Sequence, residues 1–284
     1  MLHCISSYFN PTNSKKIKEN YLTFRKNLKV PLTTVELAFN DQPFFISDSI
    51  KIRGDRNNIM WQKERLLNIA IDSLPNNIDK IAWIDADILF ENEKWFYDTE
   101  KELDDYGAVQ LFEYASEING TIDLLYNNSI GFAKCHKDQL DIPWPKPGLC
   151  WAANRDILSD GLYDKDISGS NDTYQLIIWC GMWNHHWLYR MSPINRKEFL
   201  LGNYKQYEKV LGNIGYVKGN IKHLYHGQFK NRQYYHRLDI LENHNFNPDL
   251  DISINAQGIF YWSSNKPILH EQIGQYFIDR KDDE

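Results

Sequence analysis

Two aspartates separated by one residue are the side chains best suited to chemistry in this sequence. Asp85 and Asp87 follow the apolar residues 81–84 and precede the apolar residues 88–90. Two carboxylates so close together repel each other unless a cation lies between them, and Mg²⁺ or Mn²⁺ suits oxygen ligands. Acids that only faced water would not need apolar residues on both sides, so the segment predicts a metal site rather than a solvated strand end.

A second group of candidate ligands lies between His223 and Arg232, where imidazole and cationic side chains are concentrated. Neutral imidazole is a suitable ligand for Mn²⁺, and a nearby cation eases the departure of a phosphate. His226, directly before Gly227, is the first candidate for the metal and His223 is the second, with two ordinary surface or core-edge histidines as the alternative. Lys230 and Arg232 are candidates for binding phosphate, and a solvated basic face is the alternative interpretation.

The elements that must position these residues follow an alternating pattern. Residues 2–9 and 32–39 are apolar or β-branched runs that end at turn residues, which predicts two strands. Residues 14–28 and 67–74 carry apolar side chains at spacings of three and four, which predicts two helices. With residues 81–84 as a further buried strand, the βαβ pattern predicts a mostly parallel central sheet flanked by helices. Ligands of such sheets bind at the carboxyl ends of strands, where the two aspartates stand.

The most apolar stretch, residues 176–191, predicts a core helix, because polar residues interrupt it and it is too short to span a membrane. His185 and His186 lie within this stretch and are interpreted as histidines at the edge of the core rather than as ligands. The metal prediction therefore depends on the two aspartates and the later histidines.

The overall composition excludes several classes of protein. Of the 284 residues, 14% are aromatic, which is far more than a disordered scaffold contains. The 32 lysines and arginines against 38 aspartates and glutamates give a formal net charge of −6, which argues against a nucleic-acid-binding protein. We expect no signal peptide and no transmembrane segment, and the four cysteines without a C-x-x-C pair indicate a cytoplasmic location.

The segment at residues 83–90 resembles the metal-binding D-x-D segment of GT-A-fold glycosyltransferases. Three further segments are similar to that family in order. Residues 61–68 resemble the helix before the D-x-D strand, and residues 148–155 resemble an acceptor-side segment. Residues 169–172 resemble the G-x-x-D turn that delivers a catalytic carboxylate in inverting members. The resemblance covers most of residues 1–240.

This resemblance implies a GT-A-like α/β fold in a single domain over residues 1–284. Residues 1–115 would form the nucleotide-sugar-binding half, and residues 116–284 the acceptor-side half with the C-terminal region. The implied activity is metal-dependent transfer of a sugar from a nucleotide-diphosphate sugar, with a UDP-sugar favoured, to a hydroxyl acceptor such as a glycan. An inverting mechanism is favoured, Mn²⁺ or Mg²⁺ is the implied metal, and the oligomeric state stays open.

The resemblance also implies roles for particular residues. Tyr8 and Glu36, near the ends of the first two strands, would border the nucleotide, although a plain core role is an equal alternative for Tyr8. Of Lys63 and Arg65, one would reach the donor while the other faces solvent.

Asp172 would be the catalytic base, with helix capping as the alternative. Asp85 would contact both the metal and the donor. Trp144, Trp151 and Trp183 are candidates for packing on a sugar face or for the core.

Two other functions stay open at the level of sequence. One is an enzyme of phosphoryl or nucleotidyl transfer, against which stands the absence of a P-loop and of the Gly-rich pyrophosphorylase loop. The other is a non-catalytic carbohydrate-binding protein, which would leave the aspartates and late histidines without a role.

Overall fold

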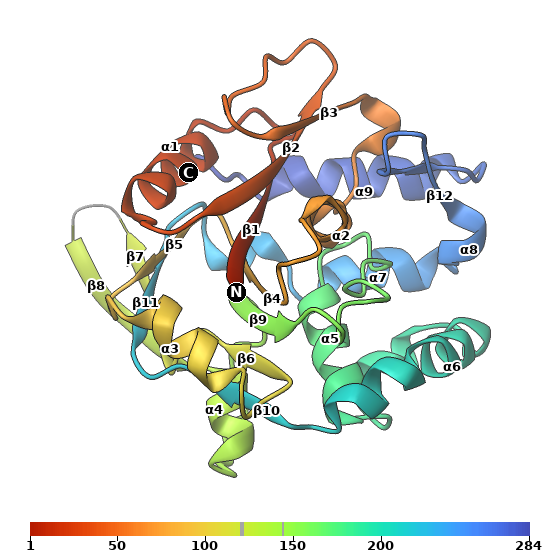
Figure 1. The fold of residues 1–284 in the computed structure, drawn as a ribbon. Coiled ribbons are helices and arrows are strands. Elements are labelled where there is room, and N and C mark those ends of the chain that lie inside the picture. The colour runs from red at the N-terminus through yellow and green to blue at the C-terminus, as the bar shows by residue number, and fades with distance from the viewer. Residues whose placement is uncertain (120–121, 144) are drawn as a thin grey trace.

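The computed structural model describes residues 1–119, 122–143 and 145–284. A central sheet has the strand order β10-β6-β9-β4-β1-β2-β3 (Figure 1). Its strands are β1 (Leu2–Phe9), β2 (Leu32–Phe39), β3 (Ile50–Gly54), β4 (Lys80–Ile84), β6 (Ala108–Gln110), β9 (Cys150–Asn154) and β10 (Ile214–Tyr216). β9 runs antiparallel to β4 and β6, and the other neighbouring pairs are parallel. The predicted α/β architecture with a mostly parallel sheet is confirmed.

A smaller sheet continues from the aspartate segment, in the order β5-β11-β7-β8. Its strands are β5 (Ile88–Phe90), β7 (Tyr114–Asn119), β8 (Ile122–Ile130) and β11 (Asn220–Leu224), and a separate pair is formed by β12 (Ile252–Ile254) and β13 (Phe260–Trp262). β11 pairs antiparallel with β5, which places His223 opposite Ile88. The backbone N–H of Leu224 also donates to the carbonyl oxygen of Asp87 at 2.9 Å. This pairing joins two segments more than a hundred residues apart in sequence.

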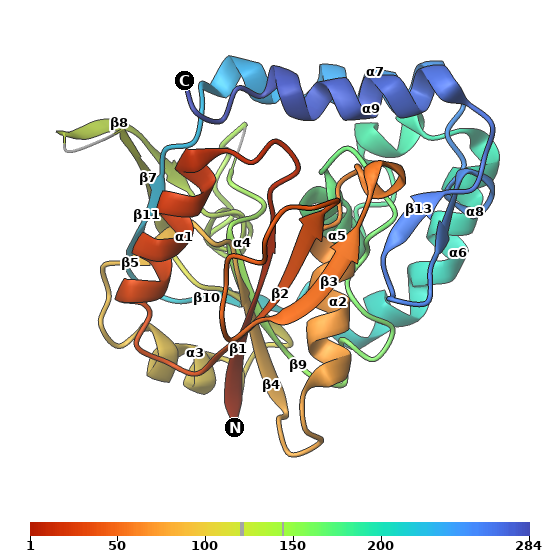
Figure 2. The same cartoon turned by 90° about the horizontal axis from the view of Figure 1, so that it is seen from above.

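Helices cover both faces of the central sheet. They are α1 (Lys15–Asn27), α2 (Lys63–Ser73), α3 (Trp95–Glu102), α4 (Phe132–Lys137), α5 (Asn171–Cys180), α6 (Pro193–Val210), α7 (His236–Asn243), α8 (Pro248–Asp251) and α9 (Pro267–Asp279), with 3₁₀ turns η1 (Arg56–Asn58), η2 (His186–Arg190) and η3 (Phe229–Arg232). Side chains of α1 and α3 pack on one face, and those of α2 and α5 pack on the other. Figure 2 shows α7 and α9 lying across the carboxyl edge of β1, β2 and β3. Among the described residues, no helix combines the length and apolarity needed to cross a bilayer.

The strand β4 shows why the sequence folds in this way. Its alternate residues Ile81 and Trp83 pack into the core on the face covered by α2, whereas Ala82 and Ile84 pack on the face covered by α1. A strand buried on both faces reads as a continuous apolar run, as this one does. The run ends where the strand reaches the sheet edge, and Asp85 is the first residue past it.

The predicted helix over residues 176–191 is wrong as a single element. Helix α5 ends at Cys180 because Gly181 adopts a left-handed conformation with φ of 62°. The backbone N–H of Gly181 then bonds back to carbonyls of the last turn, which closes the helix in the way glycine favours. The aromatic residues that follow form the turn η2 instead of continuing the helix.

Candidate active site and metal centre

A cleft of about 1120 Å³ opens at the carboxyl edge of the central sheet. Its wall includes Asp85 and Asp87 after β4, Asp172 in the first turn of α5, and the two histidines His223 and His226. This edge is where parallel sheets place their ligands, because the loops that follow the strands converge there. The cleft therefore gathers most of the residues that the sequence singled out.

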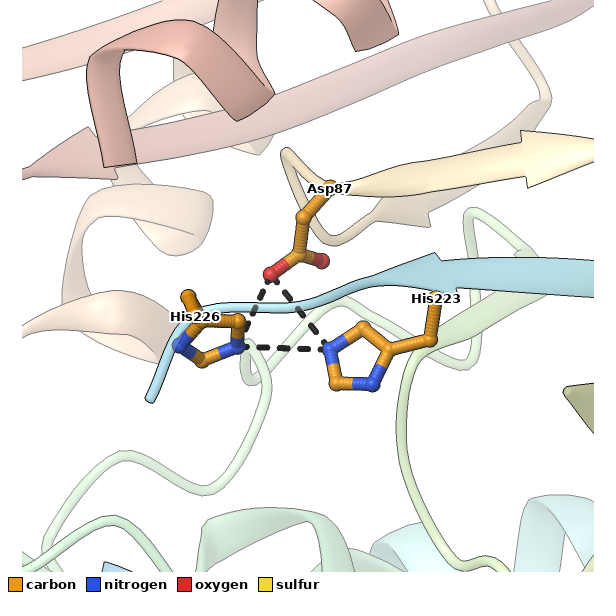
Figure 3. A group of neighbouring side chains, drawn as sticks. All are labelled: Asp87, His223 and His226. Carbon is orange, nitrogen blue, oxygen red and sulfur yellow. Dashed lines mark hydrogen bonds and ion pairs between the residues drawn. The ribbon is translucent and has the colours of Figure 1, made fainter. Parts of the chain in front are cut away.

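Asp87, His223 and His226 converge on one point in this cleft (Figure 3). The Nε2 atoms of the two imidazoles lie 3.3 Å apart. Asp87 Oδ2 lies 3.4 Å from His223 Nε2 and 3.1 Å from His226 Nε2. All three ligand atoms lie within 4.8 Å of one another, which is the spacing of groups that share a metal ion.

Each imidazole is also held from behind by a second carboxylate. Glu117 Oε1 lies 3.3 Å from His223 Nδ1, and Asp282 Oδ1 lies 3.3 Å from His226 Nδ1. A carboxylate at Nδ1 keeps the proton on that nitrogen and leaves the Nε2 lone pair for a metal. The Nε2 atoms of both histidines therefore face Asp87, at one point of the cleft.

The charges of the triad fit a cation. Burial by itself would raise the pKa of Asp87, but the adjacent His223 and His226 hold that pKa well below its usual range. Burial by itself would lower the pKa of His223, but Asp87 and Glu117 raise it to about 9. Asp87 Oδ1 is buried and has no hydrogen-bond partner among the described residues, which is costly for a carboxylate oxygen. A divalent ion bound by Asp87 Oδ2 and the two Nε2 atoms would compensate the charge of this buried carboxylate.

Lys63 links three carboxylates beside the triad. Its Nζ lies 2.8 Å from Asp85 Oδ1, 3.2 Å from Asp172 Oδ2 and 3.7 Å from Glu64 Oε1. Burial alone would lower the pKa of Lys63, but Asp172, Asp85 and Glu64 hold it well above its ordinary value. Burial raises the pKa of Glu64 to about 8 and that of Asp85 to about 6, against the opposing effect of Lys63.

The structure therefore separates the two aspartates that the sequence grouped together. Asp87 joins the histidines, whereas Asp85 forms an ion pair with Lys63 and is not part of the described three-residue ligand group. The shared role of Asp85 in metal and donor binding stays a prediction.

The Asp172 carboxylate is held by the side chain of Lys63 and is not the cap of helix α5. Ser170 is the residue that precedes α5, and the Asp172 carboxylate accepts from Lys63 Nζ at 3.2 and 3.3 Å. Gly148 lies directly against this carboxylate, since a Cβ built on Gly148 would be 2.2 Å from Asp172 Oδ2. The side chain is 28% exposed, so a small molecule in the cleft can reach it. Helix capping, the alternative interpretation, does not describe this carboxylate.

The cleft also contains cations that have no carboxylate partner among the described residues. Arg232 is only 7% exposed, donates to the Tyr234 hydroxyl at 3.4 Å and leaves its Nε without a partner. Arg237 is also buried and donates to Gly169 O at 2.6 Å. Lys230 lines the cleft and is exposed. Among the described residues Arg232 and Arg237 form no ion pair at short distance, and a buried guanidinium is a strong binding group for a phosphate.

Two predicted donor-binding residues lie away from the cleft. Glu36 is buried, and its carboxylate accepts from the backbone N–H groups of Phe45 and Ile46 at 2.5 and 3.1 Å, so it fixes the loop after β2. Arg65 is paired with Asp164 at 3.1 Å. Neither side chain is among those that line the cleft.

The remaining predicted residues divide between the cleft and the core. Tyr8 lines the cleft although it is only 5% exposed, and its ring stacks on Phe45 with centroids 5.7 Å apart. Within the segment of residues 148–155 that resembles an acceptor-side segment, Gly148 and Leu149 line the cleft, whereas Trp151, on β9, is a core residue that donates to Pro147 O at 2.8 Å. Trp183 packs against Tyr207 and does not line the cleft, and Trp144 lies outside the described residues.

Sequence reasoning missed several residues of the cleft. Glu117 and Asp282, which hold the histidines, lie in segments without a motif, so only the folded chain brings them to the site. Trp61 lines the cleft, and Glu64 lies 3.7 Å from Lys63 Nζ beside it. Both belong to residues 61–68, which resembled the helix before the D-x-D strand, but no role was predicted for either. His185 and His186, interpreted from the sequence as histidines at the edge of the core, both line the cleft, and neither belongs to the described three-residue ligand group.

No protein-family profile and no curated protein matches this sequence. Glucosyl-3-phosphoglycerate synthase from Mycobacterium tuberculosis, in complex with Mn²⁺, uridine diphosphate and phosphoglyceric acid, is similar in structure with 10% identity over 88% of this chain and 77% of that chain (TM-score 0.42). The catalytic domain of Drosophila β1,4-galactosyltransferase 7 is similar with 15% identity over 61% and 58% (TM-score 0.32). A putative glucose-1-phosphate thymidylyltransferase from Bacillus anthracis is similar with 11% identity over 91% and 99% (TM-score 0.36). Identities and TM-scores this low support no argument about function, so the function is argued from the residues of the cleft.

Proposed function

We propose that this protein is a metal-dependent glycosyltransferase that transfers a sugar from a nucleotide-diphosphate sugar to a hydroxyl acceptor. The observation that supports this most is the arrangement of one cleft, in which a two-histidine and one-aspartate group lies together with Arg232, a buried arginine whose Nε has no hydrogen-bond partner among the described residues. The three-residue group suits a divalent metal, and the arginine suits a phosphate. Together they would stabilise the negative charge of a departing diphosphate.

Asp87, His223 and His226 would hold the metal through one carboxylate oxygen and two imidazole nitrogens. When bound, a divalent metal neutralises negative charge on the departing nucleoside diphosphate. Imidazole nitrogen is a better ligand for Mn²⁺ than for Mg²⁺, which prefers oxygen ligands and keeps its waters. The donor set therefore favours Mn²⁺ of the two predicted ions.

Arg232 and Lys230 would bind the phosphate oxygens. Arg232 is fixed by burial and by Tyr234, so its guanidinium is oriented before the donor arrives. Lys230 is exposed on the turn η3 and can adjust to the ligand. A preorganised cation stabilises charge without the cost of ordering it during the reaction.

Asp172 would accept the proton of the acceptor hydroxyl in an inverting transfer. Lys63 holds the Asp172 carboxylate at 3.2 Å, and the side chain is 28% exposed, so an acceptor hydroxyl in the cleft can reach it. Tyr8 lines the part of the cleft beside β1 and would border the nucleotide, for which a UDP-sugar is the favoured donor.

A panel of nucleotide-sugars incubated with Mn²⁺ tests this proposal and separates it from nucleotidyl transfer. A glycosyltransferase releases the nucleoside diphosphate, slowly to water and faster when a hydroxyl acceptor is added. A nucleotidyltransferase would instead form pyrophosphate from a nucleoside triphosphate and a sugar 1-phosphate. Pyrophosphate formation without release of a nucleoside diphosphate would refute the proposal, and nucleotide-sugar binding without either product would favour a non-catalytic carbohydrate-binding protein.

A further inference from the structure

The last residues of the chain lie against the metal-binding loop rather than away from it. In Figure 1 the C-terminal end lies beside α1, on the same side of the molecule as the smaller sheet. Asp283 accepts from Ser14 Oγ at 2.6 Å and from the backbone N–H of Lys16 at 2.8 Å, which joins the segment to the start of α1. The Tyr225 hydroxyl donates to the carbonyl oxygen of Glu284 at 2.9 Å.

The loop after His226 is shaped to admit this segment. Gly227 has a φ of 87°, and a Cβ on it would lie 2.9 Å from the carbonyl oxygens of both Arg280 and Lys281. A side chain at this position would therefore collide with backbone rather than with a flexible group. The close approach brings Asp282 to the rear of the His226 ring.

Asp282 is well placed to act on His226. It is 7% exposed, and its Oδ1 lies 3.3 Å from His226 Nδ1 and 3.1 Å from Arg280 Nη2. Arg280 fixes the position of the carboxylate through this ion pair, so the carboxylate can hold the His226 ring by its Nδ1–H. His223 has an equivalent partner in Glu117, but that partner lies on the neighbouring strand β7.

We propose that Asp282, held by Arg280, is a positioning residue of the metal centre that orients His226 so that its Nε2 lone pair faces the ion. This inference depends on the metal site of the proposed function. Carboxylates that hold a ligating histidine typically contribute 10- to 100-fold to metal affinity. Asp282 thereby couples the end of the chain to a site formed by residues far away in sequence.

Titration of Mn²⁺ into the protein without nucleotide, followed by electron paramagnetic resonance of the free ion, tests the inference. We expect Asp282→Ala to raise the Mn²⁺ dissociation constant about 10- to 100-fold, with the fold checked by circular dichroism. Asp282→Asn should lose less, because its side-chain carbonyl still accepts from Nδ1–H. Glu284→Gln is the matched control, since it removes a nearby charge that contacts Lys281 and neither histidine, and it should leave the affinity unchanged.

Three outcomes would contradict the inference. Wild-type affinity in Asp282→Ala would refute the positioning role alone. Equal losses in Asp282→Ala and Asp282→Asn would show that charge rather than orientation matters. If the wild-type protein binds no Mn²⁺, both this inference and the proposed function fail.

Discussion

At the scale of single residues, the two histidines work as a matched pair. Each carries a carboxylate at Nδ1, and each directs Nε2 toward Asp87. In the metal-free protein the same geometry lets Asp87 hold a proton on His223, whose pKa is raised to about 9. A metal and a proton therefore compete for the same nitrogen.

This competition makes metal binding release a proton. Because His223 is protonated below pH 9 in the metal-free protein and must be neutral to bind the ion, Mn²⁺ binding at pH 7.5 should release about one proton from it. The release should disappear above about pH 9, and the apparent affinity should rise as the pH rises toward that value. Calorimetry in buffers of different ionisation enthalpy measures the number of protons released. His223→Gln is the control, and an equal proton release in that variant, or none in the wild type, would contradict the assignment.

At the scale of elements, the approach of the β9 loop to α5 determines where Asp172 lies. Gly148 precedes β9, and any side chain on it would enter the space of the Asp172 carboxylate. Lys63, on α2, holds the same carboxylate from the other side. Three elements thus fix the proposed base, and a small change in one of them should displace it.

Gly148→Ala is expected to lower kcat while leaving the affinity for Mn²⁺ unchanged. The new methyl group would lie 2.2 Å from Asp172 Oδ2, so the carboxylate must move away. Displacement of a catalytic group by about 1 Å can cost on the order of 10²-fold in rate. Steady-state kinetics with the active donor measures the effect. Gly202→Ala is the control, because a Cβ there meets nothing within 4 Å, and a wild-type kcat in Gly148→Ala would remove Asp172 from the proposed chemistry.

The local elements around the site were predictable from the sequence, because their signals are short-range. The strands over residues 2–9 and 32–39 match β1 and β2, and the amphipathic pattern over residues 14–28 matches α1, for which the Ser14 side chain accepts from the backbone N–H of Ile17. The same short-range reasoning failed at residues 176–191, because hydrophobicity continues past Gly181 although its backbone conformation ends the helix.

The convergence of side chains was less predictable, because it depends on contacts between distant segments. The late histidines were predicted as ligands from their chemistry, but the pairing of β11 with β5 that places them beside Asp87 has no local signal. Asp85 was predicted as a ligand from its pairing with Asp87, and Glu36 from its place near the end of the second strand. In the structure Lys63 pairs with Asp85, and the loop after β2 donates to Glu36. A sequence pattern does not show which neighbouring group pairs with a given carboxylate in the folded chain.

At the scale of the whole molecule, the cluster formed by Lys63, Glu64, Asp85 and Asp172 joins helices on one face of the sheet to the end of its central strand, β4. Lys63 lies on α2, Asp85 follows β4 and Asp172 lies on α5. The pKa of Lys63 is raised in the folded protein. The contribution of Lys63 to stability is therefore present in full below the ordinary lysine pKa and is lost only as the pH rises through the raised value. Near neutral pH the cluster should therefore support the fold as well as the site.

Lys63→Met should reduce the free energy of unfolding by about 3 kcal/mol at pH 8, because it leaves buried carboxylates without their cation. The loss should be smaller at pH 5, where Asp85 and Glu64, whose pKa values are raised to about 6 and about 8, can be neutral. Urea unfolding at both pH values measures the difference. Lys165→Met removes an exposed ion pair with Asp249 and should cost less than about 1 kcal/mol, and an equally small loss in Lys63→Met would contradict the structural role of the cluster.

The central claim is that one cleft uses a metal held by Asp87 and the two histidines to release a nucleoside diphosphate from a nucleotide-sugar. The most direct test is release of the diphosphate by the wild-type protein and by Asp87→Ala, each titrated with Mn²⁺ and with a chelator. We predict turnover that depends on Mn²⁺ in the wild type and is lost in Asp87→Ala, with the fold of the variant intact. Turnover that persists in the chelator, or in a folded Asp87→Ala variant, would contradict the claim.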